Sequence, residues 1–379
     1  MATQLNNWLS IDKVSGTGNA QITLTASSYG ELVDRAASLK IQAQSTNAIL
    51  NVRQKAYTPI EKNDNYFWVE FENTGGKVGD LGNSWTDIYY SFDANTWTAV
   101  DSTGVVSLGT NRLVYLKNNT KKLLRDLDNY TSIRFNSNAK IGGDLSSMTD
   151  MMDYCCKYLF YNNTYLVDAS ELILPWATLA YDCYRSMFDG CTSLTTAPAL
   201  PATTLAEFCY YFMFHNCRSL TTAPALPATT LAEGCYQYMF YACTSLTTAP
   251  ELPATTLAIS CYNDMFDGCT SLTTAPELPA TTLAVYCYSE MFYGCRSLTT
   301  APALPATTLA DCCYQYMFYG CTSLNYIKML STDISASNCL YDWVIGVAPT
   351  GTFVKHPDAN IPTGTSGIPS GWTVETATS

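Results

Sequence analysis

A 26-residue repeat in the second half of the chain constrains the fold more than any other sequence feature. The pair Met-Phe recurs six times at this spacing without a slip, at Met187, Met213, Met239, Met265, Met291 and Met317. A fixed period of this size is typical of solenoid proteins, in which each unit packs only against its neighbours. The repeats therefore predict a stacked array rather than a single globular core.

Within each unit, the pattern of apolar residues predicts a helix, which in one copy spans about 203 to 215. On a helical wheel of about 100° per residue, one half of the circle collects the apolar positions that are the same in every copy. These positions are Leu205, Ala206, Cys209, Tyr210, Met213 and Phe214. Positions 207, 208, 211, 212 and 215 fall on the other half and differ between copies. We expect the helix to be followed by a short strand at 219–222, which ends before Pro224 because proline lacks a backbone donor.

The wording of this unit resembles the BspA-like leucine-rich repeats of Bacteroidales surface proteins. Residues 291–314 read MFYGCRSLTTAPALPATTLADCCY, which fits the pattern MF.GC.SL...P.LPATTLA..CY of that family. The resemblance implies a curved right-handed solenoid that is used in adhesion and recognition.

The N-terminal segment, residues 1–58, alternates as β-strands do, and we predict strands at 21–25, 38–42 and 49–54 in a small β-sandwich. Its motifs WLSI, GTG, ITLT, RAASL and LNVRQKA, in this order, resemble those of a BACON domain. That resemblance implies association with carbohydrate or mucin, although such modules also act as spacers.

The chain is predicted to be multidomain, with two N-terminal all-β sandwiches followed by an α/β leucine-rich-repeat solenoid. Further strands at 66–72, 88–92, 112–117 and 131–135 place the second sandwich in residues 59–146. The solenoid then occupies 147–346, with a divergent capping repeat at each end. Residues 347–379 form a C-terminal capping segment that we expect to lay an extended strand and Trp372 over the last unit.

Charge and hydropathy exclude several classes of partner. The net charge of −12 argues against nucleic acid or an anionic membrane surface, because phosphate would be repelled. No apolar run is long enough to predict membrane insertion. The first residues contain neither a basic nor an apolar signal region, so the given chain shows no signal peptide. The N-terminal domains could support a homo-oligomer or contact a virion partner.

Sixteen cysteines raise the question of disulfides or metal. Twelve of them occupy two repeat positions, represented by Cys209 and Cys217. The eight residues between these positions span about 12 Å if helical, and packed helices lie about 8–10 Å apart, both beyond the reach of a disulfide. We therefore predict reduced thiols in the core. Metal binding and cofactors are not expected, because His215 and His356 are the only histidines and neither recurs.

Function is expected on the half of the wheel that varies between units, which is rich in Tyr and acidic residues. Tyrosine mixed with small polar residues is typical of recognition surfaces, whereas a solvated helix face is the plainer interpretation. The candidate binding residues are Phe208, Tyr211, Glu233, Tyr238, Tyr241, Asp264, Asp267, Tyr286, Glu290, Tyr293, Tyr316 and Tyr319. Asp264 and Glu290 could form a glycosidase pair, but they are placed on a convex face without a cleft. No catalytic motif is present, so we predict that the protein is not an enzyme.

The sequence thus predicts a non-enzymatic adhesion or recognition protein that presents this face to a glycan or protein on a cell surface. Two settings remain open, a fibre or decoration protein of a phage virion and an exported bacterial surface adhesin. A purely structural spacer is the third possibility.

Overall fold

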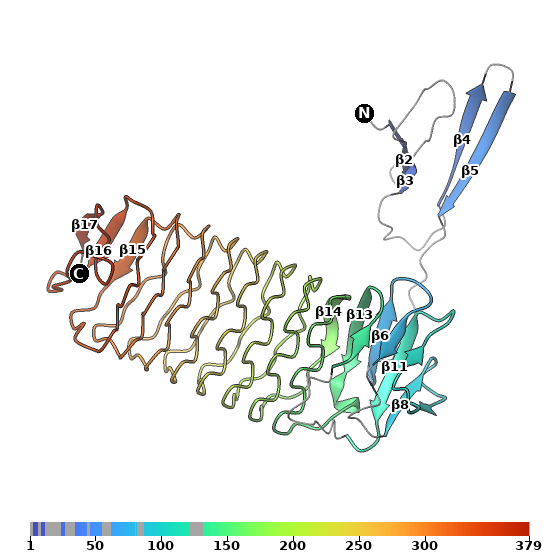
Figure 1. The fold of residues 1–379 in the computed structure, drawn as a ribbon, viewed down its shortest axis with the longest axis horizontal. Helices are drawn as coiled ribbons and strands as arrows, with labels where there is room; N and C mark the ends of the chain where they lie inside the picture. The colour runs from blue at the N-terminus through green and yellow to red at the C-terminus, as the bar shows by residue number, and fades with distance from the viewer. Residues whose placement is uncertain are drawn as a thin grey trace. The chain divides into compact units, whose positions relative to one another are not determined.

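The computed structural model describes residues 3–6, 9–11, 24–26, 35–43, 46–54, 62–79, 81, 87–121 and 132–378. The chain divides into two compact units, Met1–Lys62 and Asn63–Ser379, which we describe separately (Figure 1).

The first unit contains two small antiparallel sheets. One has the order β1-β2-β3, and the other is the hairpin β4-β5, in which Arg35 pairs with Gln54. The strands are β1 (Thr3–Asn6), β2 (Leu9–Ile11), β3 (Leu24–Ala26), β4 (Arg35–Ala43) and β5 (Thr46–Gln54). The strands predicted at 38–42 and 49–54 lie within β4 and β5, whereas most of the strand predicted at 21–25 falls outside the described residues. The packing of the two sheets into a sandwich also falls outside them and stays a prediction.

The second unit begins with a six-stranded sheet of order β14-β13-β6-β11-β8-β9 and a three-stranded sheet of order β10-β7-β12. The strands are β6 (Phe67–Phe71), β7 (Lys77–Gly79), β8 (Ile88–Ser91), β9 (Thr98–Ala99), β10 (Val106–Ser107), β11 (Leu113–Asn118), β12 (Arg134–Phe135), β13 (Ala139–Asp144) and β14 (Leu166–Ile173). Strands β6, β8, β11 and β12 fall at the four predicted places. A second sandwich and the predicted domain boundaries stay predictions.

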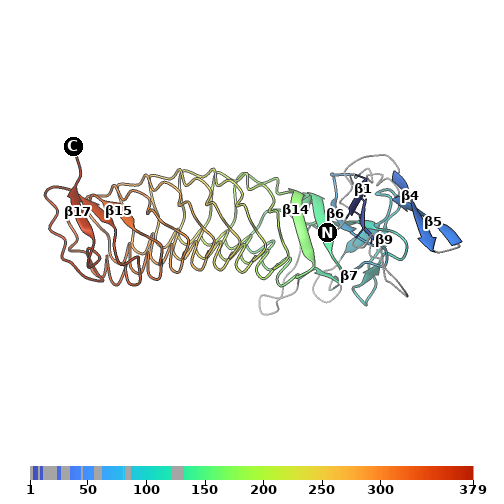
Figure 2. The same ribbon diagram turned by 90° about the horizontal axis from the view of Figure 1, so that it is seen from above.

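The six-stranded sheet runs directly into the repeats. Strand β14 belongs to the first capping repeat and pairs in parallel with β13. Asp168 of β14 in turn bridges to Thr196, and the same bridge recurs one repeat later, between Thr196 and Thr222. Figures 1 and 2 show the result, a row of coils that continues from the edge of the sheet. A single hydrophobic core extends from Phe67 through the coils to Trp372.

The predicted helix of the repeat unit is wrong, and with it the α/β class of the array. The described part of the chain contains no α-helix, only one 3-10 turn, η1 (Leu145–Ser147), so its fold is all-β. Residues 207–216, which include most of the predicted helix, instead form consecutive turns, in which every fourth residue from Phe208 has a positive φ. In this unit the φ values are 54° at Phe208, 56° at Phe212 and 62° at Asn216.

Alternating hydrogen bonds explain why the turns form and stack. Every second amide reaches the next unit: Tyr210 N–H donates to the Cys235 carbonyl at 3.0 Å, and Phe214 N–H donates to that of Met239 at 2.9 Å. The amides between them close turns within the unit, as from Met213 N–H to the Tyr210 carbonyl at 3.0 Å. All these donors are satisfied without a helix, because the ladder between units supplies the partners that buried backbone needs.

Burial follows this four-residue period, with two side chains inward and two outward. Cys209, Tyr210, Met213 and Phe214 are buried, as predicted, whereas Leu205 and Ala206 are only partly buried. Identical residues of successive units stack on one another: the phenylalanine rings at 188, 214 and 240 lie 5.4 and 5.6 Å apart and almost parallel. Stacking of identical apolar residues thus builds the core.

All sixteen cysteines are buried as free thiols, in agreement with the predicted reduced core. Those at the second repeat position donate to a backbone carbonyl of the preceding unit. Cys217 Sγ lies 3.1 Å from the Phe188 oxygen, and Cys243 Sγ lies 3.0 Å from the Phe214 oxygen. The thiol therefore both packs in the core and donates a hydrogen bond to a buried backbone carbonyl.

The last coils are closed by a three-stranded parallel sheet of β15 (Tyr326–Met329), β16 (Thr352–Lys355) and β17 (Thr373–Thr376). The indole of Trp343 donates to the Gly367 carbonyl and that of Trp372 to the Ala348 carbonyl, each at 2.8 Å. Trp372 is buried, so the tail covers the end of the core as expected.

The residue before the second repeat cysteine has a positive φ, and this predicts that glycine is favoured at that position. Gly294 occupies this position with φ 67°, and an added Cβ would meet only atoms at ordinary contact distance. Gly294→Ala should therefore lower the free energy of unfolding by about 1–2 kcal/mol through backbone strain alone. Ala242 has the same conformation, φ 57°, so Ala242→Gly is the reciprocal control and should not destabilise. Urea denaturation of both variants measures the free energy of unfolding. Equal losses of stability in the two variants would contradict the role of backbone strain.

Candidate functional site

The turns place two rows of side chains on one face of the coil stack, which we call the turn face. The first row consists of Ser186, Phe212, Tyr238, Asp264, Glu290, Tyr316 and Asp342, and the second of Asp189, His215, Tyr241, Asp267, Tyr293, Tyr319 and Ile345. Consecutive members of a row are 26 residues apart and belong to adjacent coils. Side chains distant in sequence are thereby brought into contact in the order of the units.

Aromatic rings occupy the turn face in the second and third complete units. Phe212 and Tyr238 stack at 4.4 Å between ring centroids with an angle of 10°. Tyr211 meets Tyr238 edge to face at 5.6 Å, and His215 lies 5.2 Å from Tyr241. The rings support one another and form a continuous aromatic surface.

Three carboxylates follow these rings. One oxygen from each of Asp264, Asp267 and Glu290 lies within 4.8 Å of the others. Burial, followed by the charges of Glu290 and Asp267, raises the pKa of Asp264 to about 8. Burial and then Glu290 raise the pKa of Asp267 to about 7, and burial raises that of Glu290. Such a group of oxygens offers the ligands that hard divalent cations prefer.

A second aromatic group follows the carboxylates. The rings of Tyr293 and Tyr319 are parallel, 4.7 Å apart at an angle of 1°, and Tyr316 meets Tyr319 edge-on at 6.0 Å. With Glu290, Asp342 and Ile345 these tyrosines line a cavity of about 440 Å³. The cavity draws its walls from three successive coils.

At the other end of the array, acidic side chains lie beside basic side chains of the chain itself. The Asp182 carboxylate is buried and lies 3.2 Å from Lys157 Nζ and 3.3 Å from Arg185 Nη1. The Arg185 guanidinium also lies 4.6 Å from the centre of the Tyr211 ring. His215 Nδ1 is 2.7 Å from a carboxylate oxygen of Asp189.

Eight of the twelve predicted binding residues lie in the two rows: Tyr238, Tyr241, Asp264, Asp267, Glu290, Tyr293, Tyr316 and Tyr319. Tyr211 lies beside them, and Phe208 contacts Tyr211 at 5.7 Å. Glu233 and Tyr286 belong to the preceding turn and are exposed, so they are not brought into the rows. The list of candidate binding residues omitted Phe212 and His215, although both positions were placed on the variable half of the wheel, and it also omitted Asp342. A step of 26 residues from Tyr316 would have found Asp342.

Backbone geometry accounts for part of the composition of this face. The whole first row except Phe212 and the two tyrosines consists of Ser, Asp and Glu, and φ at these positions is positive, as with 55° at Asp264 and 56° at Glu290. Asp and Asn tolerate this conformation better than most residues, and no Val, Ile or Thr occurs with positive φ in the described residues. The aromatic residues have no such backbone advantage, and they carry the argument for recognition.

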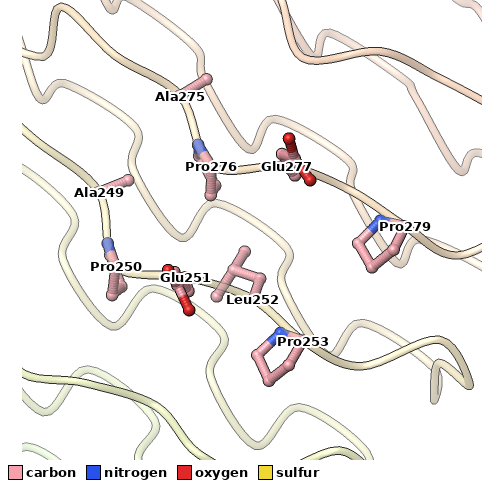
Figure 3. Close-up of a pocket in the computed structure, with 9 residues that line it drawn as sticks. All are labelled: Ala249, Pro250, Glu251, Leu252, Pro253, Ala275, Pro276, Glu277 and Pro279. Atoms are coloured by element: carbon pink, nitrogen blue, oxygen red, sulfur yellow. The ribbon is translucent and has the colours of Figure 1, made fainter.

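A second hollow lies on the proline-containing return segments (Figure 3). Its cavity of about 460 Å³ is lined by two successive segments that begin at Ala249 and Ala275. Glu251 and Glu277 are its only charged residues, at a position that is alanine in the neighbouring units, as at Ala225. The prolines leave this surface rigid but with few hydrogen-bond donors.

Helices long and apolar enough to cross a membrane are absent from the described residues.

Residues 157–250 and 233–342 match the family model described as the BspA type Leucine rich repeat region, in six copies. Neither a curated protein nor a solved structure was found to match the chain. The resemblance of residues 1–58 to a BACON domain stays a prediction. The matched residues include every member of the two rows except Ile345, so the turn face is built by the family's own repeat. Residues 157–342 of the chain therefore match BspA-type leucine-rich repeats.

Proposed function

We propose that the protein is a non-enzymatic adhesion or recognition protein whose turn face contacts a partner on a cell surface. The observation that carries this proposal is the aromatic, acidic, aromatic order along the two rows. Tyrosine gives a large contact area at a small cost in side-chain entropy, and carboxylates between the rings add polar recognition. BspA-type repeats are consistent with surface adhesion.

The arrangement of the rings favours a binding role for this face over the alternative of a merely solvated surface. Phe212 and Tyr238 present stacked rings that are only partly buried, and Tyr241 continues them in the second row. Clustered aromatic side chains at a surface are typical of interaction sites. Asp264 and Glu290 lie among them as acceptors for the hydroxyl or amino groups of a glycan or protein.

The experiment compares binding of labelled full-length protein to a glycan array and to whole bacterial cells. The double variant Tyr238→Ser, Tyr241→Ser should lose about tenfold or more in affinity, since a central interface ring commonly contributes about 1–2 kcal/mol. Tyr165→Ser removes an exposed tyrosine outside the turn face and serves as the matched control. Unchanged binding of the double variant, or absence of binding by the wild type, would favour a structural spacer instead.

For the setting, we favour a fibre or decoration protein of a phage virion over an exported bacterial adhesin. Virions assemble in the reducing cytoplasm, where the core thiols that donate to carbonyls, such as Cys217 and Cys243, stay protonated and unoxidised. Detection of the protein in purified virions by mass spectrometry tests this preference. Its presence in the outer envelope of uninfected cells would establish the adhesin.

A further inference from the structure

The cavity at the C-terminal end of the turn face differs from the rest of that face in its chemistry. Glu290 and Tyr293 come from one coil, Tyr316 and Tyr319 from the next, and Asp342 from the capping coil. Ile345 completes the lining, and the volume is about 440 Å³. A cavity of this size accommodates one or two side chains of a partner rather than a whole small domain.

Its walls are aromatic rings held in place before any ligand arrives. The parallel rings of Tyr293 and Tyr319 lie 4.7 Å apart, and Tyr316 packs edge-on against Tyr319. Tyr341 in turn contacts Tyr316 edge-on at 5.4 Å. Such a preformed set of π faces attracts cations, and it loses little entropy on binding.

The charge of the cavity is negative and is not balanced by the chain. Neither Glu290 nor Asp342 forms an ion pair with a Lys or Arg side chain in the described part of the chain, and none of the six lining residues is basic. The Asp342 carboxylate accepts a hydrogen bond from a neutral group, the Thr365 Oγ1 hydroxyl, at 2.9 Å. Burial, then Tyr319, Asp267 and Glu290, raise the pKa of Tyr293, as expected where negative charge accumulates.

The other end of the array contains a comparable group of carboxylate and rings together with the cations that neutralise it. There a carboxylate, that of Asp182, is combined with tyrosine rings and with cations from the chain itself. Lys157 Nζ lies 5.0 Å from the centre of the Tyr154 ring and 3.2 Å from Asp182, and Arg185 joins Asp182 to Tyr211 in the same way. The C-terminal cavity has the carboxylates and the rings without the cation.

We propose that the cavity lined by Glu290, Tyr293, Tyr316, Tyr319 and Asp342 receives a lysine or arginine side chain from a basic segment of a partner protein. The carboxylates would pair with the charge, and the tyrosine rings would cover the alkyl stem and the cation. A neutral sugar could donate hydrogen bonds to these carboxylates but would leave their charge uncompensated, so the cavity favours a cationic protein over a glycan. This inference rests on the proposed function and specifies the partner of the same face.

The test measures fluorescence anisotropy of a labelled peptide of alternating serine and lysine with the full-length protein, near neutral pH and at low ionic strength. Acetylating every lysine of the peptide should weaken binding by about tenfold or more, because the ammonium charge is lost. Glu290→Gln should weaken binding of the unmodified peptide by about tenfold, and Asp342→Asn should act in the same direction. Tyr319→Leu should also weaken it, since the ring face is lost.

Glu277→Gln is the matched control, because it removes the same charge from the proline-lined hollow. It should leave peptide binding within about twofold of wild type, which separates a specific site from attraction by the overall charge of −12. Equal binding of the acetylated peptide, or equal losses in Glu277→Gln and Glu290→Gln, would overturn the inference. Loss of cell binding in the Tyr238, Tyr241 double variant together with no peptide binding would leave the recognition role intact and remove only the cationic partner.

Discussion

Met239→Asp is expected to cost more stability than any other single change considered for the coils. The Met239 side chain is fully buried, and its carbonyl accepts the amide of Phe214 in the ladder between units. A buried carboxylate without a partner costs several kcal/mol, on the order of 4 or more. Because each coil contacts only its neighbours, the loss should divide the array into two parts that melt separately.

Calorimetry of the full-length protein measures this, and Tyr241→Ser is its control from the same unit. Tyr241 is only partly buried on the turn face, so its replacement should shift the melting temperature far less. Similar losses in the two variants would mean that the assignment of inward and outward positions is incorrect.

The carboxylates of Asp264, Asp267 and Glu290 should make the protein less stable as the pH rises. The pKa of Asp264 is raised from 3.8 to about 8 and that of Asp267 to about 7, so the folded state holds protons that the unfolded chain releases. The free energy of unfolding therefore falls between about pH 4 and about pH 8, by an amount on the order of a few kcal/mol at most. Above about pH 8 this contribution no longer changes.

Asp264→Asn should remove much of this dependence and raise the melting temperature at about pH 8 by several degrees, with little effect near pH 4. Asparagine tolerates the positive φ of 55° at this position, so the change does not add backbone strain. Glu277→Gln, on the proline-lined hollow, should leave the pH dependence unaltered. A wild-type protein that is most stable at alkaline pH would contradict the arrangement of the three carboxylates.

The sequence predicted the stacking and most of the buried positions but assigned the wrong backbone. Cys209, Tyr210, Met213 and Phe214 are buried whether residues advance by about 100° or by 90° per position, since the two periods diverge little over one short segment. The four-residue period was visible only indirectly. Gly190, Gly268 and Gly294 stand just before the second cysteine, where a helix has no need of glycine and a left-handed residue does.

The candidate site was predictable to the extent that it depends on which positions vary between copies. Tyr238 and Glu290 were found because the wheel and the turns both place them outward. Asp264 lies in the same row, but the structure buries it, which the wheel did not predict. The pairing of row members could not be predicted, because a helix would have separated neighbouring units by about 8–10 Å. The ladder brings them to the separation of adjacent strands, and Tyr293 and Tyr319 therefore stack at 4.7 Å.

The same ladder of hydrogen bonds fixes the spacing of side chains along the turn face. Each coil advances by one strand separation, about 4.8 Å, so groups on the rows fall at whole multiples of that step. Gain or loss of one 26-residue unit between the two aromatic clusters during evolution would change the distance between them by one strand separation. The contacts within each cluster would stay unchanged. Spacing between contact groups could thus be adjusted to a new partner by recombination between near-identical repeats, without a single point mutation in the core.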